Sequence, residues 1–262
     1  MKYVSITFDD GREDSFSVAF PVLKKYGMVA TIFCTTGFID GTWPKKEDWY
    51  SAEKPISIEQ LKKLEGYGWE IALHGDEHIT DVDDTIKAID KMEKWGLGRN
   101  QYGFSLPNSI DDVCKFDEFK AKLLNEKIYY IRKGRKIDTT AVLPRFLYGL
   151  YRLLKLQSAY NRFNYSNVCK LEKIDKENIY SIVIRFEDDP VMVANFIDSL
   201  PEDSCIVMML HSIIARSGEL YGTDPWNWED KRLEQFCSLI AEKDDISVLT
   251  LMDIVKKSEE AL

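Results

Sequence analysis

The chain has 262 residues, of which 45% are hydrophobic, so it is long enough to bury a substantial core. Its formal net charge of -9 argues against general nucleic-acid binding, which favours a basic protein. No apolar run approaches the length of a membrane span, and the first apolar segment leaves no room for a signal peptide before it, so we expect a cytoplasmic protein.

Short apolar segments alternate with helical patterns along most of the chain. We expect strands at 3–8, 30–36, 69–74, 102–107, 127–133, 179–186, 204–210 and 247–251. Helical patterns lie between them, at 15–26, 57–67, 81–95, 115–125, 191–199 and 229–242. The strand segments are rich in Val and Ile without strict polar alternation, as in strands buried on both faces. This repeated βα order favours a parallel sheet closed into a (β/α) barrel of seven or eight strands.

A basic segment at about 138–170 departs from this alternation. From Lys127 to Lys170 the chain has ten Lys or Arg residues and one acid, Asp138, so its local charge is +9 and the remainder carries -18. The stretch PRFLYGLYRLLKLQSAYNRF within it is aromatic, basic and helix-like. We expect a helical insertion in a single-domain protein. Either it packs on the barrel with its basic face in water, or it forms a surface for an anionic substrate, a partner or a membrane interface.

Aspartate and histidine side chains follow three of the expected strands. Asp9 and Asp10 end the first strand, His74 and His78 follow the third within HGDEH, and His211 follows SCIVMML. The chain has no other histidines. Because the carboxyl ends of the strands in a (β/α) barrel lie at one face, these side chains should meet there.

This combination of residues indicates a metal site. Two histidines four residues apart can bind one metal ion, and a carboxylate can supply a further ligand. A divalent cation would also offset the repulsion between the adjacent carboxylates, leaving one as a ligand and the other as a base. Each signal alone is weak, since an Asp-Asp pair can simply cap a turn. The HExxH pattern of zinc proteases is absent, because Gly75 follows the first histidine.

Three motifs carry a resemblance to a known family. TFDDG at Thr7–Gly11, HGDEH at His74–His78 and LHS at Leu210–Ser212 resemble the first, second and fifth motifs of the polysaccharide deacetylases. This family, carbohydrate esterase family 4, is built on the NodB homology domain. The order and approximate spacing agree over most of the chain apart from the basic segment, although Ser212 stands where the family usually has an aspartate. The resemblance implies a distorted (β/α) barrel of about seven strands.

The resemblance also implies a site and a reaction. It implies one divalent metal ion, most often zinc, bound by Asp10, His74 and His78. Asp9 would then be the general base, and His211 the general acid that protonates the leaving group. The implied reaction is hydrolysis of an acetyl group, N-linked or O-linked, on a carbohydrate substrate.

Two other family motifs are altered. In GFSLPNS, Ser105 occupies the position of an arginine that orients the catalytic aspartate, whereas Pro107 fits the motif and is a candidate substrate-binding residue. The next strand, KIYYIRKG, lacks the family's tryptophan but contains Arg132. Because neighbouring strands lie about 4.8 Å apart, a long arginine near the end of this strand can reach a point served by its neighbour. We therefore expect Arg132 to grip Asp9 in place of the missing arginine.

Aromatic residues in two loops are candidates for sugar binding. Trp226 and Trp228, in DPWNWED, could form a wall that stacks on a pyranose ring. The same segment equally has the pattern of a loop with an anchoring tryptophan that leads into a helix. Trp43, Trp49 and Tyr50 are weaker candidates for the same role.

Two alternatives to a carbohydrate deacetylase remain open from the sequence. One is a related hydrolase that cleaves another C–N bond, such as a cyclic amide or ureide, with the same metal, base and acid. The other is a noncatalytic carbohydrate-binding domain that has kept the metal. The replacement at Ser105 favours the second alternative slightly. The retained Asp9, Asp10 and His211 oppose it, because pure binding needs neither a base nor an acid.

Overall fold

The computed structural model describes residues 1–43, 54–109, 113–136, 142–223 and 225–261. The main sheet contains β1 (Lys2–Phe8), β2 (Thr31–Cys34), β3 (Glu70–Leu73), β4 (Tyr102–Ser105), β5 (Ile128–Arg132), β6 (Cys169–Lys170), β7 (Ile182–Val183), β8 (Ser204–Leu210) and β11 (Ile246–Val248). Its order is β5-β4-β3-β2-β1-β8-β6, with β11 paired to β1 and β7 to β8. All pairs are parallel except that of β6 with β8. Two further short strands, β9 (Ile213–Ile214) and β10 (Trp228–Glu229), pair with each other.

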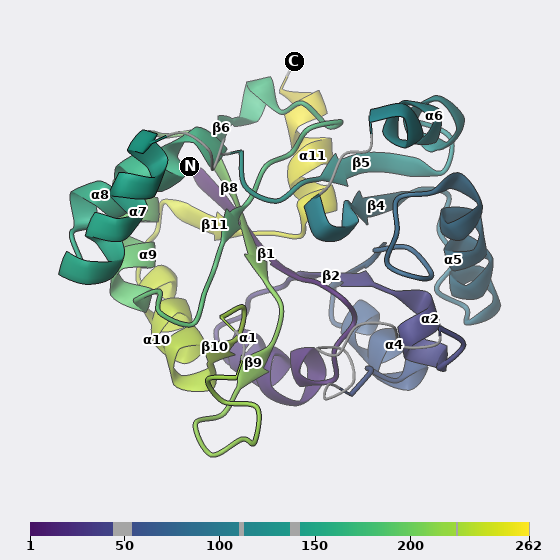
Figure 1. Ribbon diagram of the computed structural model, residues 1–262, viewed down its shortest axis with the longest axis horizontal. Helices are drawn as coiled ribbons and strands as arrows, with labels where there is room; N and C mark the ends of the chain where they lie inside the picture. Colours follow the sequence, from purple (N-terminus) through teal and green to yellow (C-terminus); the bar gives the residue numbers. More distant parts are fainter. Residues whose placement is uncertain (44–53, 110–112, 137–141, 224, 262) are drawn as a thin grey trace.

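Helices cover the outer side of the curled sheet (Figure 1). They are α1 (Phe20–Lys25), which continues a π-helical turn at Ser15–Ala19, then α2 (Thr36–Asp40), α4 (Ile58–Gly66), α5 (Val82–Lys94), α6 (Val113–Leu123), α7 (Val142–Leu154), α8 (Gln157–Asn164), α9 (Pro190–Asp198), α10 (Asp230–Ala241) and α11 (Leu251–Glu260). Several begin where the sequence offers a side-chain cap. Ser57 and Gln60 form a capping box before α4, and Asp81 accepts backbone N–H groups at the start of α5.

Irregular backbone bonds join the two ends of the curled sheet. Arg132 of β5 forms a parallel bridge with Ile179, just before β7. The Lys133 N–H donates to the Ile179 carbonyl at 2.7 Å, and the Ile179 N–H donates to the Ile131 carbonyl at 3.1 Å. The distorted (β/α) barrel that the sequence predicts is therefore confirmed, with β1 to β5, β7 and β8 around its axis.

Strand β7 is much shorter than the sequence predicts. The apolar pattern predicts a strand over 179–186, but only Ile182 and Val183 pair as a strand, with Met208 and Met209 of β8. The cause is a change of neighbour, since Ile179 bonds to β5 whereas Ile182 bonds to β8. A segment that crosses from one neighbour to the other cannot keep a continuous ladder with either.

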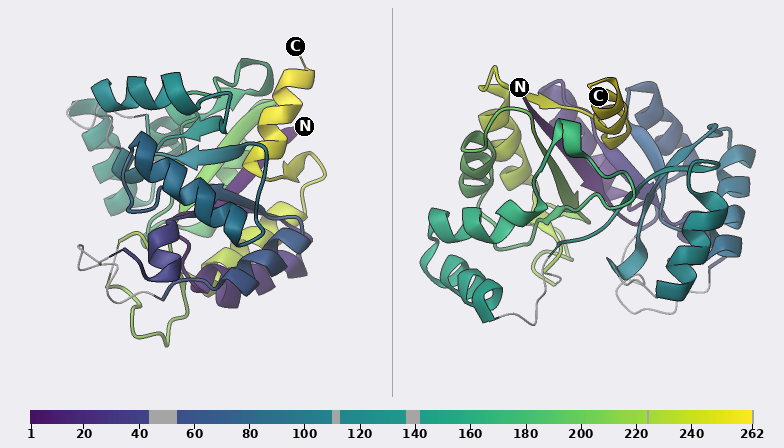
Figure 2. Two further views of the ribbon diagram at one scale, coloured as in Figure 1. Left: turned by 90° about the vertical axis from the view of Figure 1, so that its right-hand side faces the viewer. Right: turned by 90° about the horizontal axis from the view of Figure 1, so that it is seen from above.

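The last expected strand is also shorter, because a helix begins inside it. The pattern predicts a strand to residue 251, but β11 ends at Val248 and Thr250 caps α11 by accepting the Asp253 N–H. Leu251, Met252 and Val255 of α11 are buried against side chains that point into the barrel, among them Phe33, Ala72, Tyr130 and Val207. Figure 2 shows α11 close to the end of the sheet where both termini lie, so this helix closes the barrel there.

A buried carboxylate joins this helix to the barrel. Glu70 accepts hydrogen bonds from the Tyr130 hydroxyl at 2.8 Å, the Thr31 hydroxyl at 2.9 Å and the Met252 N–H at 2.9 Å. Burial raises the pKa of Glu70, although these three donors oppose the rise. The carboxyl group therefore links β2, β3, β5 and α11 in a place that water does not reach.

We predict that Glu70→Gln lowers the free energy of unfolding by about 2–3 kcal/mol. The amide keeps one acceptor oxygen, but its NH2 group would face a hydroxyl or N–H donor, which leaves buried donors unsatisfied. Urea unfolding followed by circular dichroism measures the change. Glu65→Gln is a matched control that removes a half-exposed ion pair with Arg99 and should cost less than about 1 kcal/mol. Equal losses in the two variants would contradict the linking role of Glu70.

Candidate functional site

The adjacent carboxylates of Asp9 and Asp10 point to different partners. Asp10 has a φ of 75°, in the left-handed region, so the backbone turns sharply directly after β1. Asp9 is still tied to the sheet, because its N–H donates to the Leu210 carbonyl of β8 at 3.0 Å. Both side chains are buried, and each has its own arginine, Arg132 for Asp9 and Arg12 for Asp10. The turn and the two arginines together relieve the repulsion that the sequence implies.

The two histidines of HGDEH are presented by a loop with a constrained shape. His74 directly follows β3, and its N–H donates to the Cys34 carbonyl of β2 at 2.9 Å. Asp84 of α5 accepts the N–H groups of Asp76 and Glu77 at 2.7 and 2.9 Å. Gly75 has a φ of 82°, and a Cβ atom there would lie 2.7 Å from the Asp84 carboxylate. The glycine of the motif is therefore required both by its backbone and by this close approach.

The ligand atoms of Asp10, His74 and His78 fit one metal ion. Asp10 Oδ1 lies 3.6 Å from His74 Nε2 and 3.7 Å from His78 Nε2, and the two Nε2 atoms are 3.2 Å apart. Donors arranged tetrahedrally about 2.0–2.1 Å from a zinc ion would be separated by about 3.3 Å. His74 Nδ1 lies 2.8 Å from the Ser105 carbonyl, which can only accept, so its Nε2 carries the lone pair that a metal needs. The expected set of one carboxylate and two imidazoles is thus brought together.

Electrostatics around this set favour metal-binding protonation states. Burial alone would raise the pKa of Asp10, but the charge of Arg12 and the neighbouring histidines lower it well below its usual range. Burial lowers the pKa of His74 to about 4, against the opposing charge of Asp10. Near neutral pH the carboxylate is therefore ionised and the imidazole neutral, as metal ligation requires.

Arg132 reaches Asp9 as the sequence predicts. Its side chain is buried, donates to Asp9 Oδ1, and lies with its guanidinium 4.9 Å from the centre of the Phe33 ring inside the barrel. Ser105, which stands at the family's usual arginine position, pairs with Arg132 across β4 and β5. The guanidinium thus comes from β5, the strand next to the one where the family motif has its arginine, and it still meets the carboxylate of Asp9.

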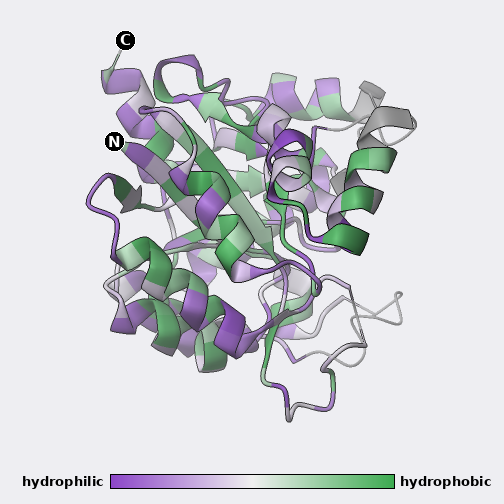
Figure 3. Cartoon of the chain, turned by 90° about the vertical axis from the view of Figure 1, so that its left-hand side faces the viewer, coloured by the Kyte–Doolittle hydropathy of each residue, from purple (hydrophilic) through white to green (hydrophobic). Residues whose placement is uncertain are grey.

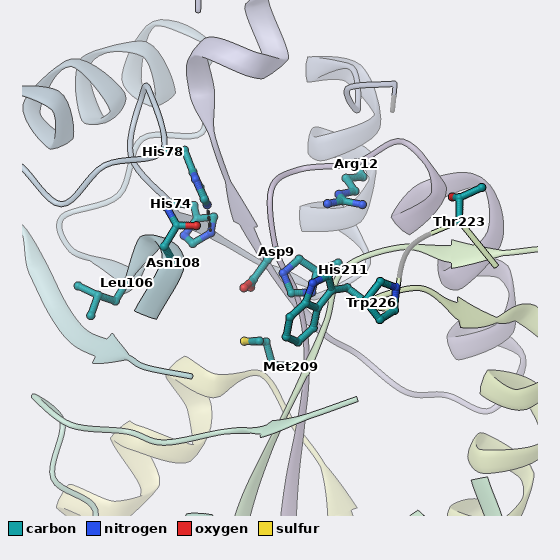
Figure 4. Close-up of a pocket in the computed structure, with 11 residues that line it drawn as sticks. Asp9, Arg12, His74, His78, Leu106, Asn108, Met209, His211, Thr223 and Trp226 are labelled. Atoms are coloured by element: carbon teal, nitrogen blue, oxygen red, sulfur yellow. Dashed lines mark hydrogen bonds between the residues drawn. The ribbon is translucent and has the colours of Figure 1, made fainter. Parts of the chain in front are cut away.

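His211 faces the metal-ligand set across a cavity of about 460 Å³. Figure 4 shows Asp9 between the histidine pair and His211, with the Trp226 ring beside His211 at a centroid distance of 5.6 Å. Leu106, Asn108, Met209, Thr223 and Pro225 complete much of the wall. Burial lowers the pKa of His211 to about 4, although the charges of Asp10 and Asp9 act in the opposite direction.

Arg12 lines the same cavity, and the sequence reasoning does not identify it. Its Nε and Nη2 atoms lie 3.0 and 2.8 Å from Asp10 Oδ2, and its Nη1 donates to the Ser212 hydroxyl at 2.7 Å. It therefore binds Oδ2 of Asp10, and Oδ1 of Asp10 faces the two histidines. Its bond to Ser212 also joins the loop after β1 to the residue that follows His211. The only available signal is a basic residue directly after the DDG turn.

Other predicted residues lie elsewhere. Trp228 is buried in β10, packs against Phe236 and donates to the Asp188 carbonyl, so the prediction that it stacks on a sugar is wrong for this structure. Pro107 is buried between cavity-lining neighbours but is not itself part of the wall. Trp43 is buried beside His78, at a ring distance of 6.3 Å, and supports that histidine from outside the cavity. Trp49 and Tyr50 fall outside the described residues.

Sequence comparisons identify the N-terminal part of the chain. Residues 1–101 match the family model described as polysaccharide deacetylase. The chain is also similar to YxkH of Bacillus subtilis (strain 168), whose name describes it as a polysaccharide deacetylase. The two are 38% identical over 102 residues, which is 35% of this chain and 33% of that protein. The N-terminal 101 residues are therefore similar in sequence to the polysaccharide deacetylases. This confirms the resemblance carried by TFDDG and HGDEH, and the chain spans about a third of the length of that relative.

Solved structures extend the likeness to the fold of nearly the whole chain. The Xyl-CE4 domain of a multidomain xylanase from the hindgut metagenome of Trinervitermes trinervoides is 13% identical, with a TM-score of 0.52 over 98% of this chain and 91% of that chain. A mutant of a CE4 family pseudoenzyme with restored enzymatic activity is 12% identical, with a TM-score of 0.50 over 97% and 68% of the two chains. At these identities the likeness concerns the polysaccharide deacetylase fold alone.

We predict that acid destabilises the metal-free protein through His74. The pKa of His74 is lowered to about 4 by burial, whereas a histidine in an unfolded chain titrates near 6.5. The unfolded state therefore takes up the proton first, and the free energy of unfolding should fall as pH drops from about 6.5 toward about 4. Urea unfolding in the presence of a chelator measures this slope, which His74→Asn should reduce by about one proton. Identical slopes for wild type and variant would contradict a buried, neutral His74.

We also predict that the cost of losing Arg12 depends on metal. Arg12→Met should lower the free energy of unfolding of the metal-free protein by about 3–5 kcal/mol, because it leaves Asp10 buried and uncompensated. Saturating zinc should restore part of this loss, since a bound cation supplies positive charge at the same carboxylate. Arg99→Met is a control whose half-exposed ion pair with Glu65 should cost less than about 1 kcal/mol with or without zinc. Equal losses of Arg12→Met in chelator and in zinc would argue against Asp10 as a ligand.

Proposed function

We propose that the chain is a metal-dependent hydrolase that removes acetyl groups from a carbohydrate. The observation that carries the proposal is the meeting of four elements in one cavity: a metal-ligand set, a carboxylate held by an arginine, a histidine opposite it and an aromatic wall. The match of residues 1–101 to the polysaccharide deacetylase model supports the same reaction class.

The proposed ligands of the metal ion are Asp10, His74 and His78, with zinc as the expected metal. Bound there, a divalent ion would act as a Lewis acid toward the acyl oxygen and the attacking water. Arg12 holds the second oxygen of Asp10, and the Ser105 carbonyl fixes the ring of His74. These contacts orient the ligands before any ion binds, which limits the reorganisation that binding requires.

Asp9 is the proposed general base. It lines the cavity beside the ligand set, and the Arg132 guanidinium holds one of its oxygens, so the carboxylate is fixed in direction. In that position it can take a proton from water that attacks the acyl carbon. This pair also counts against a purely binding role, because a domain that only binds sugar has no need of an oriented base.

His211 is the proposed general acid. It lies on the cavity wall across from the histidine pair and can give a proton to the departing nitrogen or oxygen. Because burial lowers its pKa to about 4, His211 is neutral near pH 7 in the free protein. The proton that Asp9 takes from the attacking water must therefore pass to His211, which then gives it to the leaving nitrogen or oxygen. The half-buried Trp226 beside it is the proposed surface for a sugar ring.

The decisive test is acetate release from N-acetylglucosamine oligosaccharides and from acetylated xylo-oligosaccharides with zinc present. We predict that Asp9→Asn lowers kcat by about 10²–10⁴-fold while keeping bound zinc, since the base is removed and the ligands remain. His74→Ala should lose the zinc as well as the activity. Zinc content by elemental analysis, measured beside the rate, separates the two effects.

Arg132→Met extends this comparison to the positioning arginine. It should lower kcat while leaving zinc content unchanged, because the base loses its orientation but the ligands do not. Full activity in Asp9→Asn would require another base and would overturn the proposed mechanism. Zinc binding without acetate release from any acylated sugar would favour the noncatalytic alternative, and hydrolysis of a cyclic amide or ureide instead would favour the other hydrolase.

A further inference from the structure

Helix α7 exposes large apolar side chains to solvent along one face. Phe146, Leu153 and Leu154 are 60%, 81% and 55% exposed, and Leu156 in the following turn is 42% exposed. Figure 3 shows this helix at the surface, with green hydrophobic segments between paler and purple ones. Single exposed apolar residues are ordinary, but a cluster on one helix marks an interaction surface.

The opposite face of α7 is firmly attached to the barrel. The buried Tyr151 donates its hydroxyl hydrogen bond to Asp188, and the Tyr148 hydroxyl donates to Glu187 at 2.9 Å. Tyr151 also packs against Tyr160 of α8, with ring centroids 4.9 Å apart. The polar and aromatic side of the helix therefore holds it in place, and the leucines point outward as a consequence of this packing.

Positive charge accompanies the exposed apolar residues at the C-terminal end of α7, where residues 152–156 are all exposed. Arg152, Lys155 and Arg162 are exposed on α7, on the turn after it and on α8. The sequence contains no acidic residue between 139 and 171, although Glu187 of the neighbouring loop lies 3.0 Å from Arg152. In a chain of net charge -9, the segment 127–170 alone carries +9. A partner that covers this face should therefore be anionic as well as apolar.

The attached face of α7, which carries Tyr148, is linked to the wall of the cavity. Arg185 donates to the Tyr148 hydroxyl of α7 at 2.7 Å and stacks on the Trp226 ring at 4.5 Å. Trp226 in turn lines the cavity next to His211. Helix α7 is therefore joined to the wall of the cavity through Arg185.

We propose that Phe146, Arg152, Leu153, Leu154, Lys155 and Leu156 form a docking face for an anionic lipid bilayer. A bilayer interface accepts apolar side chains at the level of the acyl chains and basic side chains among the headgroups. Lys and Arg side chains near an anionic surface strengthen binding, so the local charge would make binding depend on anionic lipid and on salt. The docking face would hold the cavity next to saccharides attached to that membrane. It does not depend on which acyl group the site removes.

Vesicle sedimentation tests this docking face. The intact protein is mixed with phosphatidylcholine vesicles, or with vesicles that contain 30% phosphatidylglycerol, at low and at high salt. We expect at least a tenfold larger bound fraction on the anionic vesicles at low salt, with most of it lost at high salt. Leu153→Glu with Leu154→Glu, and separately Arg152→Glu with Lys155→Glu, should each reduce binding about tenfold.

A matched control and two contrary outcomes make the test decisive. Ile86→Glu changes an apolar residue on α5 that is 42% exposed and lies outside the basic segment, and it should leave vesicle binding unchanged. Equal sedimentation with both lipid mixtures, or an Ile86→Glu loss as large as that of the leucine pair, overturns the proposal. A dimer that the leucine substitutions dissociate, without vesicle binding, would assign the face to a second copy of the chain. Acetate release from soluble sugars should not change in these variants, so this proposal and the proposed function fail separately.

Discussion

Charge compensation at two adjacent buried carboxylates is the constraint on which the site depends. Asp9 and Asp10 are both buried, and two ionised carboxylates in contact would repel each other strongly away from water. The left-handed backbone at Asp10 sends the two groups in different directions, and each meets its own buried arginine. Because Arg12 also binds Ser212, the same compensation joins the loop after β1 to the residue that follows His211.

Side chains inside the barrel, between the site and helix α11, support this arrangement. Arg132 lies over the Phe33 ring, and Phe33 packs edge-on against Tyr130, whose hydroxyl donates to Glu70. Helix α11 closes the barrel beneath them. A continuous column of packed side chains therefore runs from the closing helix to Asp9 at the cavity, and in a close-packed interior such a column has few alternative arrangements.

Helix α7 presents exposed apolar and basic residues at the surface, in addition to its contacts with the barrel. Tyr148, Arg185 and Trp226 form a short chain of contacts from α7 to the cavity wall. The Trp226 ring on the cavity wall thus stacks on the Arg185 guanidinium, which also donates to the Tyr148 hydroxyl of α7. The cavity wall and α7 are consequently connected through Tyr148, Arg185 and Trp226.

The sequence by itself determined the barrel class and the meeting of Asp10, His74 and His78, because strand ends of a parallel barrel share one face whatever the loops do. It also determined the contact of Arg132 with Asp9, since adjacent strands lie within the reach of an arginine. Only the folded structure shows that Arg12 forms an ion pair with Asp10 and that Trp228 is buried. Ser212 lies 200 residues from Arg12 in the chain, and Trp228 is buried because β10 pairs with β9. Local periodicity carries no information on such distant pairings, which depend on how the completed barrel packs.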